Sequence, residues 1–233
     1  MCGGAWNRSM IDRATTLGLA FFDRPTVNVA RDLVGRWLIS HVGGVVTAGR
    51  IVECEAYPTE DSTAHSFRGP TARCASMFER PGTLYVYFTY GMHHCVNVVT
   101  ESQGVGAAVL IRALEPCQGI AMMRRRRGAN VPDRDLCRGP ARLCVALGID
   151  RRLDGIDTCA PNAAVFIADA RTSATDAAAR TTDGGGRTTR GVRVATSPRV
   201  GVVGTHADVV AKRRFFEANS VCLSSVRPGR VAT

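Results

Sequence analysis

The sequence predicts an α+β fold: a single domain with a mostly antiparallel β-sheet core, flanking helices and a protruding β-hairpin. Three observations predict this class. Short segments with strand character come in pairs joined by glycine-containing turns, which is typical of antiparallel hairpins. Segments with helix start and stop signals lie beside them. The chain has 233 residues, of which 45 % are hydrophobic and 21 % charged, a composition typical of an ordinary globular protein.

A helix and two strands are expected first. Residues 21–35, "FFDRPTVNVARDLVG", predict a helix, because Asp23 can cap its start, Pro25 suits the first turn and Gly35 suits its end. Residues 36–57 predict two strands around a Gly-Gly turn, which is a hairpin signal.

A long loop and a second hairpin follow. Residues 58–82 are polar and turn-rich and predict a loop with one helical turn. A loop of this length in a compact domain is usually functional. Residues 83–90 and 92–100 predict two more strands, joined at Tyr90 and the following glycine, and residues 106–114 predict another strand.

The second half of the chain is predicted to hold two helices and two late strands. Residues 115–127 predict a helix with Pro116 in its first turn. Residues 138–149 predict a helix that begins at a Gly-Pro pair and ends at a glycine. The late strands are expected within residues 197–204 and 212–224.

Domain organisation and location follow from composition. Residues 1–20 are expected to form a mobile N-terminal extension, and residues 21–233 a single domain with a low-complexity loop at about 170–192. No apolar run reaches ~18 residues, so we expect no membrane span. The N-terminus lacks a continuous apolar segment and a basic leader, so no signal peptide is expected. We therefore expect a monomer that is not secreted and is cytoplasmic, nucleoid-associated in a bacterium.

The cysteines and histidines do not predict a metal site. The nine cysteines are scattered without a CxxC pair, which favours free thiols in a reducing compartment. His93, His94 and Cys95 are adjacent, and neighbouring strand residues point to opposite faces. The H-x-E and P-C-x-x-C pattern of zinc deaminases is absent. We predict no metal and no cofactor.

The chain is strongly basic, with a net charge of +10 and a pI of about 9.6. Such a field favours polyanionic partners such as nucleic acid or an anionic membrane surface. However, Lys212 is the only lysine among 30 basic residues, so the other 29 are arginines, and this bias can reflect composition alone. The run at 124–127 could touch a nucleic-acid backbone or form a solvated helix face. Backbone N–H groups at Gly139 could bind phosphate.

Two carboxylates stand close together in the segment "IVECEAY". Strand alternation puts Ile51, Glu53, Glu55 and Tyr57 on one face, with the two carboxylates ~7 Å apart. One interpretation is a pair for glycosidic chemistry, in which one residue activates water and the other supports it. The alternative is a solvent-facing strand with ordinary charges. Spacing alone leaves both open, because a bulge would change it.

Three of the four tyrosines gather in "LYVYFTYGMHHCVNV" (84–98). Tyr85 and Tyr87 share a face, and Tyr90 falls at the turn. Core packing is the common role of such clusters, whereas an exposed aromatic tip on a basic protein suits base stacking or wedging into a duplex. Asn97 and Arg112 lie close to this hairpin. Arg112 interrupts an apolar run, so we expect it to be partly buried and to need an anion or several acceptors.

Four blocks of the sequence resemble the alkyladenine (3-methyladenine) DNA glycosylase family: "GRIVECEAYPTEDSTAH", "RPGTLYVYFTYGMHHCVNVV", "AVLIRALEP" and "GPARLCVALGI". They follow the family's order, and the likeness covers residues 20–160 and 198–225. The resemblance implies a monofunctional DNA glycosylase of base excision repair. Such an enzyme flips alkylated purines out of double-stranded DNA and hydrolyses the N-glycosidic bond. The candidate lesions are 3-methyladenine, 7-methylguanine, hypoxanthine and ethenoadenine.

The resemblance also implies roles for single residues. Glu55 would activate the water, and Arg112 would help to hold it. Tyr90 would fill the gap left in the duplex, with Met92 beside it. Asn97 would sit where the exocyclic amino group of guanine clashes. The whole base pocket would comprise Tyr57, His65, Tyr87, Asn97, Leu110, Val200 and Gly201, and contacts to the DNA backbone would come from Gly139, Lys212 and Arg213.

Lyase activity is not expected. Bifunctional glycosylases use an amine nucleophile, and Lys212 lies far in the sequence from the catalytic blocks. Two other functions stay open. The chain could be a non-catalytic nucleic-acid-binding protein that uses the basic surface and the tyrosine hairpin, or a carbohydrate glycosidase that uses Glu53 and Glu55. A sugar-binding groove would normally carry tryptophans, and both tryptophans lie outside the motifs.

Overall fold

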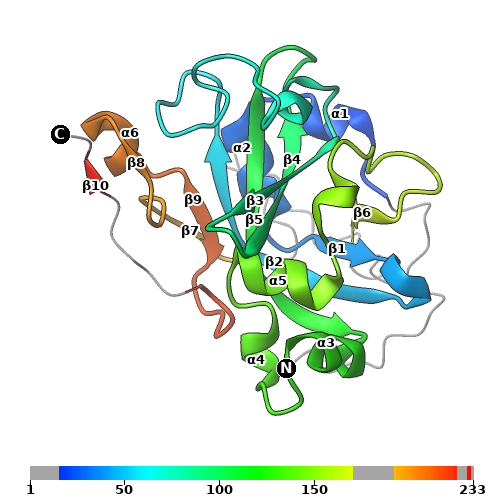
Figure 1. Cartoon of the computed structure of the whole chain (residues 1–233). Coiled ribbons are helices and arrows are strands. Elements are labelled where there is room, and N and C mark those ends of the chain that lie inside the picture. Colours follow the sequence, from blue (N-terminus) through cyan, green and yellow to red (C-terminus); the bar gives the residue numbers. More distant parts are fainter. Residues whose placement is uncertain (1–15, 170–191, 225–229, 232–233) are drawn as a thin grey trace, which may run out of the picture.

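One large, mostly antiparallel β-sheet organises the chain in this computed structural model, which describes residues 16–169, 192–224 and 230–231 (Figure 1). Within these residues the sheet has the order β3-β4-β5-β2-β1-β6, and β9 pairs with both β2 and β7. A short parallel pair, β8 with β10, forms a second sheet. The predicted α+β class is confirmed. Most of the predicted N-terminal extension and of the loop at 170–192 lies outside the described residues.

The strands and helices alternate irregularly along the chain. The strands are β1 (Trp37–Ser40), β2 (Thr47–Tyr57), β3 (Leu84–Thr89), β4 (His93–Thr100), β5 (Ala107–Gln118), β6 (Val165–Ala168), β7 (Val194–Ser197), β8 (Val203–Gly204), β9 (Arg214–Glu217) and β10 (Arg230–Val231). The α-helices are α1 (Leu19–Phe22), α2 (Thr26–Leu33), α3 (Ile120–Arg127), α4 (Asp133–Leu136), α5 (Pro140–Leu147) and α6 (His206–Val210). The 3-10 turns are η3 (Val42–Gly44), η4 (Ala75–Phe78) and η5 (Arg151–Leu153).

Both predicted hairpins are present. β1 pairs with β2 across the Gly-Gly turn, and β3 pairs with β4 across the turn at Tyr90. The long loop after β2 contains the predicted helical turn, η4. Helices α3, α4 and α5 pack together at one end of the sheet, and α6 lies with β8 and β10 at its side (Figure 1).

The predicted helix at 115–127 is partly wrong, because β5 continues to Gln118 and α3 begins only at Ile120. The cause is the length of β2, whose first half pairs with this segment and places Gly49 opposite Pro116. A Cβ at Gly49 would lie 2.9 Å from the Glu115 carbonyl oxygen, so the glycine permits the close approach of β5. Pairing between distant strands therefore overrides a local helix-start signal.

Other boundaries also differ from those predicted. The helix at 21–35 is divided into α1 and α2, and Pro25, not Asp23, occupies the N-cap of α2. The strand expected at 197–204 is mostly a loop, with only its ends in β7 and β8. The strand expected at 212–224 is limited to β9. The backbone polar groups of the 198–202 loop are consequently available for contacts at the candidate site.

Strand alternation separates a core face from a site face. Leu84 and Val86 of β3, Val96 and Val98 of β4, and Ile111 of β5 belong to one buried cluster, to which α2 and α5 add their apolar residues. The residues between them point the other way. This face carries Tyr85 and Tyr87 on β3, Cys95 and Asn97 on β4, and Leu110 and Arg112 on β5.

The predicted face of β2 is corrected at Ile51. Two register shifts lie on either side of Glu53 in the pairing of β2 with β5. The first shift adds a residue to β2 and the second adds one to β5, so each strand advances three residues between the Ile51–Leu114 and Cys54–Ile111 pairs and its alternation reverses. Ile51 and Cys54 therefore both pack in the main core cluster, while Glu53 and Glu55 both contact Arg112 on the site face.

Candidate active site

A cavity of about 370 Å³ opens on the site face of the sheet. Its walls come from β2, β5, the β3–β4 hairpin, the loop after β2 and the segment around Val200. All seven residues predicted for the base pocket line this cavity, although they are far apart in the sequence. The lining residues are Tyr57, Thr63, His65, Met77, Tyr85, Tyr87, Thr89, Tyr90, Cys95, Asn97, Leu110, Arg112, Pro140, Val200, Gly201, Val202 and Val203.

Glu55 lies fully buried directly behind this wall. Among the described residues, three donors reach its carboxylate. The Tyr57 hydroxyl and Arg112 Nη1 donate to Oε2 at 2.9 and 3.2 Å, and the Val200 backbone N–H donates to Oε1 at 2.7 Å. Each donor residue also lines the cavity. An ionised carboxylate has about four acceptor positions, so one stays available to a further donor.

Glu53 is also fully buried, so the interpretation of β2 as a solvent-facing strand is wrong. Arg112 Nε and Arg214 Nε donate to Glu53 Oε1 at 3.0 and 2.8 Å. The Ser224 N–H and hydroxyl donate to its two oxygens, both at 2.7 Å. Burial alone would raise the pKa of Glu53, but Arg112 and Arg214 more than offset it and hold the pKa below its usual value of 4.5.

Arg112 is 8 % exposed and joins the two carboxylates. Its Nε contacts Glu53, its Nη1 contacts Glu55, and its Nη2 donates to the Ser224 hydroxyl at 3.2 Å. The prediction of a partly buried arginine with several acceptors is confirmed. Burial would lower the pKa of Arg112, but the two carboxylates raise it overall, so the guanidinium stays charged.

Aromatic side chains form the cavity wall beside Glu55. The His65 and Tyr87 rings meet edge to face with centroids 4.6 Å apart, and His65 Nδ1 lies 2.8 Å from the Tyr85 hydroxyl. Burial raises the pKa of Tyr57 and of Tyr87, so both hydroxyls stay protonated. Burial and the nearby Arg73 lower the pKa of His65, which favours a neutral ring at neutral pH. The rings of Tyr57, Tyr87 and His65 are therefore uncharged and flat-sided, which suits stacking.

Asn97 is held at the base of the hairpin. Its Nδ2 donates to the Tyr85 carbonyl at 3.0 Å, and in the β-ladder it pairs with Leu110 across β5. Both side chains are almost fully buried and line the cavity. This hydrogen bond fixes the orientation of the Asn97 amide. The β3–β4 hairpin therefore sets where the amide lies relative to a ligand in the cavity.

The tip of the β3–β4 hairpin carries exposed aromatic and apolar side chains. Tyr90 is 86 % exposed and has a φ of +51°, which is uncommon for a non-glycine residue. Met92 is 69 % exposed. Phe88, which the sequence pattern did not single out, is 48 % exposed and its ring lies 5.0 Å from that of His94. Tyr90 is thus not part of the core.

A family profile described as methylpurine-DNA glycosylase (MPG) matches residues 20–221. The chain belongs to this family. A relative from Methanocella arvoryzae is 39 % identical over 212 residues, 91 % of this chain and 96 % of the relative. A relative from Granulibacter bethesdensis is 43 % identical over 90 % of this chain and 88 % of the relative. A relative from Burkholderia lata is 52 % identical over 64 % of this chain and 72 % of the relative. All three are named "Putative 3-methyladenine DNA glycosylase".

Membership of the methylpurine-DNA glycosylase family identifies the chain as a DNA repair glycosylase, an N-glycosyl hydrolase with DNA as its substrate. None of the helices in the described parts of the chain is both long and apolar enough to span a membrane. Within the same parts, no group of three or more His, Cys, Asp or Glu side chains is arranged to hold a metal ion.

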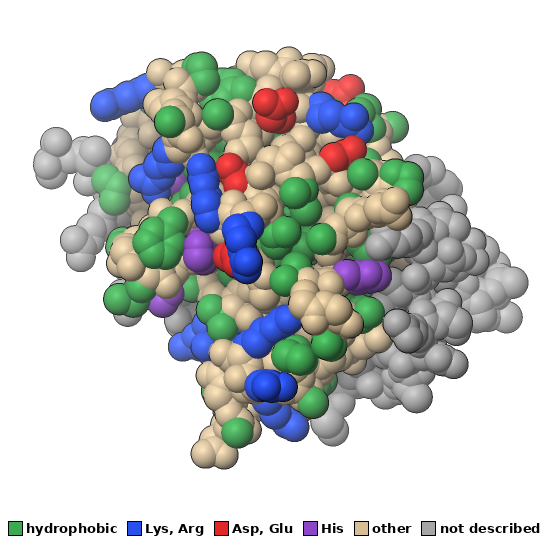
Figure 2. Space-filling model, turned by 45° about the vertical axis from the view of Figure 1, so that its right-hand side comes forward, with side chains coloured by type: hydrophobic (Ala, Val, Ile, Leu, Met, Phe, Trp, Pro, Cys, Tyr) green, Lys and Arg blue, Asp and Glu red, His purple; other side chains and the backbone are tan. Residues whose placement is uncertain are grey.

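The residues predicted to touch the DNA backbone of this glycosylase lie outside the cavity lining. Gly139 is the N-cap of α5, and Lys212 is exposed. Arg213 Nη1 donates to Asp61 at 2.6 Å and to Asp208 at 2.9 Å, so its charge is engaged within the protein. On the face shown in Figure 2, Lys and Arg side chains are dispersed among hydrophobic and polar ones.

The arginine run of α3 is also used inside the fold. Arg126 donates to the Ala146 carbonyl at the end of α5, at 3.0 Å, and Arg127 Nε donates to the Leu136 carbonyl at 3.1 Å. These contacts satisfy carbonyl groups that helices leave unpaired at their C-terminal ends. Arg124 pairs with Asp133 at 2.8 Å, so three of the four arginines of the run have a polar contact within the protein.

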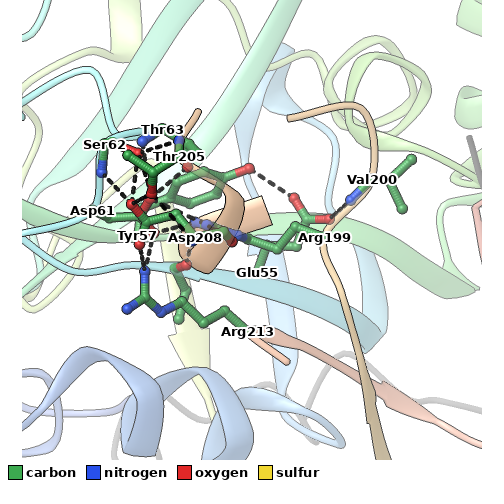
Figure 3. A network of polar contacts seen from close by, with 11 residues as sticks. Glu55, Tyr57, Asp61, Ser62, Thr63, Arg199, Val200, Thr205, Asp208 and Arg213 are labelled. Atoms are coloured by element: carbon green, nitrogen blue, oxygen red, sulfur yellow. Dashed lines mark hydrogen bonds and ion pairs between the residues drawn. The ribbon is translucent and has the colours of Figure 1, made fainter. Parts of the chain in front are cut away.

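Sequence reasoning missed the buried arginine next to Val200. Arg199 is 1 % exposed and forms an ion pair with the fully buried Asp61 (Figure 3). Its guanidinium carbon lies 4.6 Å from the centroid of the Tyr57 ring. No local pattern marks this pair, because its members are 138 positions apart. The only available signal was that "PTEDST", with Glu60 and Asp61, and "SPRVGV", with Arg199, place charged residues within otherwise turn-like sequence.

Proposed function

We propose that this chain is a monofunctional glycosylase that flips an alkylated purine out of duplex DNA and hydrolyses its N-glycosidic bond with a water activated by Glu55. The observation that carries the proposal is the position of Glu55. It is a fully buried carboxylate behind an aromatic cavity of about 370 Å³, and each of its three donor residues lines that cavity. A single flipped base fits a space of this size and stacks on flat, neutral rings.

The proposed water donates to the acceptor position of Glu55 that the three donors leave available. Arg112 also lines the cavity, and its hydrogen bond to Glu55 is the longest of the three, at 3.2 Å. Arg112 then donates to the water while Glu55 accepts one of its protons. The water oxygen bonds to C1′ of the deoxyribose, and the bond between C1′ and the base breaks with its electron pair leaving on the base.

The preferred substrate is proposed to be 3-methyladenine, with 7-methylguanine, hypoxanthine and ethenoadenine as further candidates. A purine alkylated at N3 or N7 is cationic in DNA and therefore leaves readily. Cation–π attraction to Tyr57 and Tyr87 favours such a base. That attraction is moderated, because Arg199 and Arg73 already lie over these two rings, at 4.6 and 5.6 Å from the centroids.

A hydrolytic reaction without strand cleavage is proposed because no lysine lies in the cavity wall. Lys212, the only lysine of the chain, is exposed on the segment before β9. A Schiff base requires an amine within reach of C1′.

The test is base release from duplexes that each carry one of the four lesions, with the wild type and Glu55→Gln. We expect wild-type release of at least one base and a decrease of roughly 100-fold or more in the variant, the usual size of a general-base contribution. Glu60→Gln, which changes an exposed neighbour, serves as the matched control and should keep the wild-type rate.

Binding measurements separate catalysis from simple recognition. DNA affinity of Glu55→Gln should stay within about 2-fold of the wild type, because the side chain is buried behind the cavity wall. Release of 3-methyladenine by Glu55→Gln at the wild-type rate would show that Glu55 is not the base. Tight DNA binding by a wild type that releases none of the four bases would instead identify a non-catalytic nucleic-acid-binding protein.

A further inference from the structure

The buried ion pair between Arg199 and Asp61 ties together three segments behind the candidate active site (Figure 3). Arg199 Nη1 bonds to Asp61 Oδ2, and Arg199 Nη2 donates to Asp61 Oδ1 at 3.1 Å. Arg199 also donates to the Ala56 carbonyl at the end of β2 and to the Asp208 carbonyl in α6, both at 3.0 Å. Both side chains are fully buried.

Two of the three donors to Glu55 depend on this arginine. Val200 follows Arg199 in the chain, so anchoring Arg199 sets where the Val200 N–H meets Glu55 Oε1. The guanidinium also stacks on the Tyr57 ring, whose hydroxyl donates to Glu55 Oε2. Arg199 touches neither the cavity nor Glu55, since it is absent from the cavity lining and contacts neither carboxylate oxygen.

A second set of contacts holds Asp61 in place. Arg213 donates to Asp61 at 2.6 Å and to Asp208 at 2.9 Å. Asp208 in turn accepts from the N–H and hydroxyl of Ser62, at 3.1 and 2.5 Å. The hydrogen bonds from Ser62 and Thr205, together with the charge of Arg213, lower the pKa of Asp208 to about 2, so it stays ionised. Each of the two arginines and two aspartates thus has a partner of opposite charge, as a buried charge requires, while Arg199 Nε has no hydrogen-bond partner among the described residues.

We infer that Asp61 and Arg199 are positioning residues that orient the Glu55 carboxylate through Tyr57 and Val200. The inference rests on the proposed function, because it assigns these residues to the activation of water by Glu55. Their ion pair couples the loop that carries His65 to the segment that caps Glu55. If the segment around Val200 were flexible, the Val200 N–H would leave the Glu55 carboxylate and the carboxylate would rotate. Held by Arg199, the segment keeps one acceptor position of Glu55 aimed at the cavity.

The expected effect is on the chemical step. A hydrogen bond to a charged group that is lost or misaligned changes a rate or an affinity roughly 10- to 100-fold. Asp61→Asn should therefore lower the single-turnover rate constant of base release by roughly 10- to 100-fold, with duplex affinity within about 2-fold of the wild type. Arg199→Lys keeps the charge opposite Asp61 but loses the planar group over Tyr57, and should lower the rate constant by a smaller factor.

The experiment measures three quantities for the wild type, Asp61→Asn, Arg199→Lys and the control Glu60→Gln: the single-turnover rate constant, the active fraction by titration with substrate, and the affinity for the lesion duplex. A positioning role lowers the rate constant of the active molecules. If Asp61→Asn does not fold, Arg199→Lys decides, because it preserves the ion pair.

A purely structural role would lower the active fraction and leave the rate constant unchanged, and that result would overturn the inference. A rate constant above that of the wild type would also overturn it, because the pair would then restrain Glu55. The proposed function is judged separately. If the wild type releases base, Glu55→Gln does not, and both test variants match the wild type, only the positioning inference fails.

Discussion

Replacing Tyr90 by Ala tests whether the hairpin tip acts in the DNA and not in the protein core. The ring is 86 % exposed, so its removal leaves no buried cavity. Substitutions at such positions usually change the free energy of unfolding by less than about 0.5 kcal/mol. The positive φ of +51° does not alter this estimate, because Ala meets the same backbone penalty as Tyr.

The effect on binding should be much larger than the effect on stability. Stacking of an aromatic side chain on a base contributes roughly 1–3 kcal/mol. If Tyr90 fills the gap left by the flipped base, Tyr90→Ala should weaken affinity for a lesion duplex by roughly 5- to 100-fold. Affinity for an undamaged duplex should change much less, because no gap opens there. Tyr90→Phe keeps the ring and should bind like the parent protein.

The assay is fluorescence anisotropy with lesion and undamaged duplexes at one fixed salt concentration, in the Glu55→Gln background so that turnover does not consume the lesion. Thermal denaturation of the same proteins measures stability. Equal weakening for both duplexes would refute the intercalation argument. A melting temperature lowered by more than about 4 °C would also refute it, since it would show that the ring packs within the fold.

Two further predictions concern charged groups around the site. Glu53→Gln should lower the free energy of unfolding at pH 7 by roughly 3–5 kcal/mol, because it leaves Arg112 and Arg214 with an uncompensated buried charge. Since the pKa of Glu53 is lowered in the fold, its stabilisation is present above about pH 4.5 and is lost as the pH falls through the lowered pKa, so denaturant melts of wild type and variant should converge at acidic pH. An unchanged difference at low pH would contradict this. Arg73→Gln should raise the ratio of excision rates for cationic over neutral lesions about 2- to 3-fold, because it removes a positive charge 5.6 Å from the Tyr87 ring. An equal change for both lesion classes would show that Arg73 acts only on DNA binding.

The sequence alone was sufficient for the features that depend on neighbouring residues. Period-two alternation placed Tyr85 and Tyr87 on one face and Glu55 beside Tyr57. In the structure the ring centroids of the two tyrosines lie 5.3 Å apart, and the Tyr57 hydroxyl donates to Glu55 at 2.9 Å. The turns at Gly43 and Tyr90 followed from local conformational preferences. These features were predictable because side chains alternate between the two faces of a strand every residue, and because the conformation of a tight turn depends on only a few neighbouring residues.

Features set by distant pairing were decided only by the tertiary structure. Around Glu53 an extra residue in β2 is followed by an extra residue in β5, and these two register shifts turn Ile51 into the core. Arg199 and Asp61 meet only because the loop after β2 and the segment before α6 close over the same end of the sheet. No local pattern encodes such a contact, since its stability comes from burial and charge pairing between segments that are neighbours only in the folded chain.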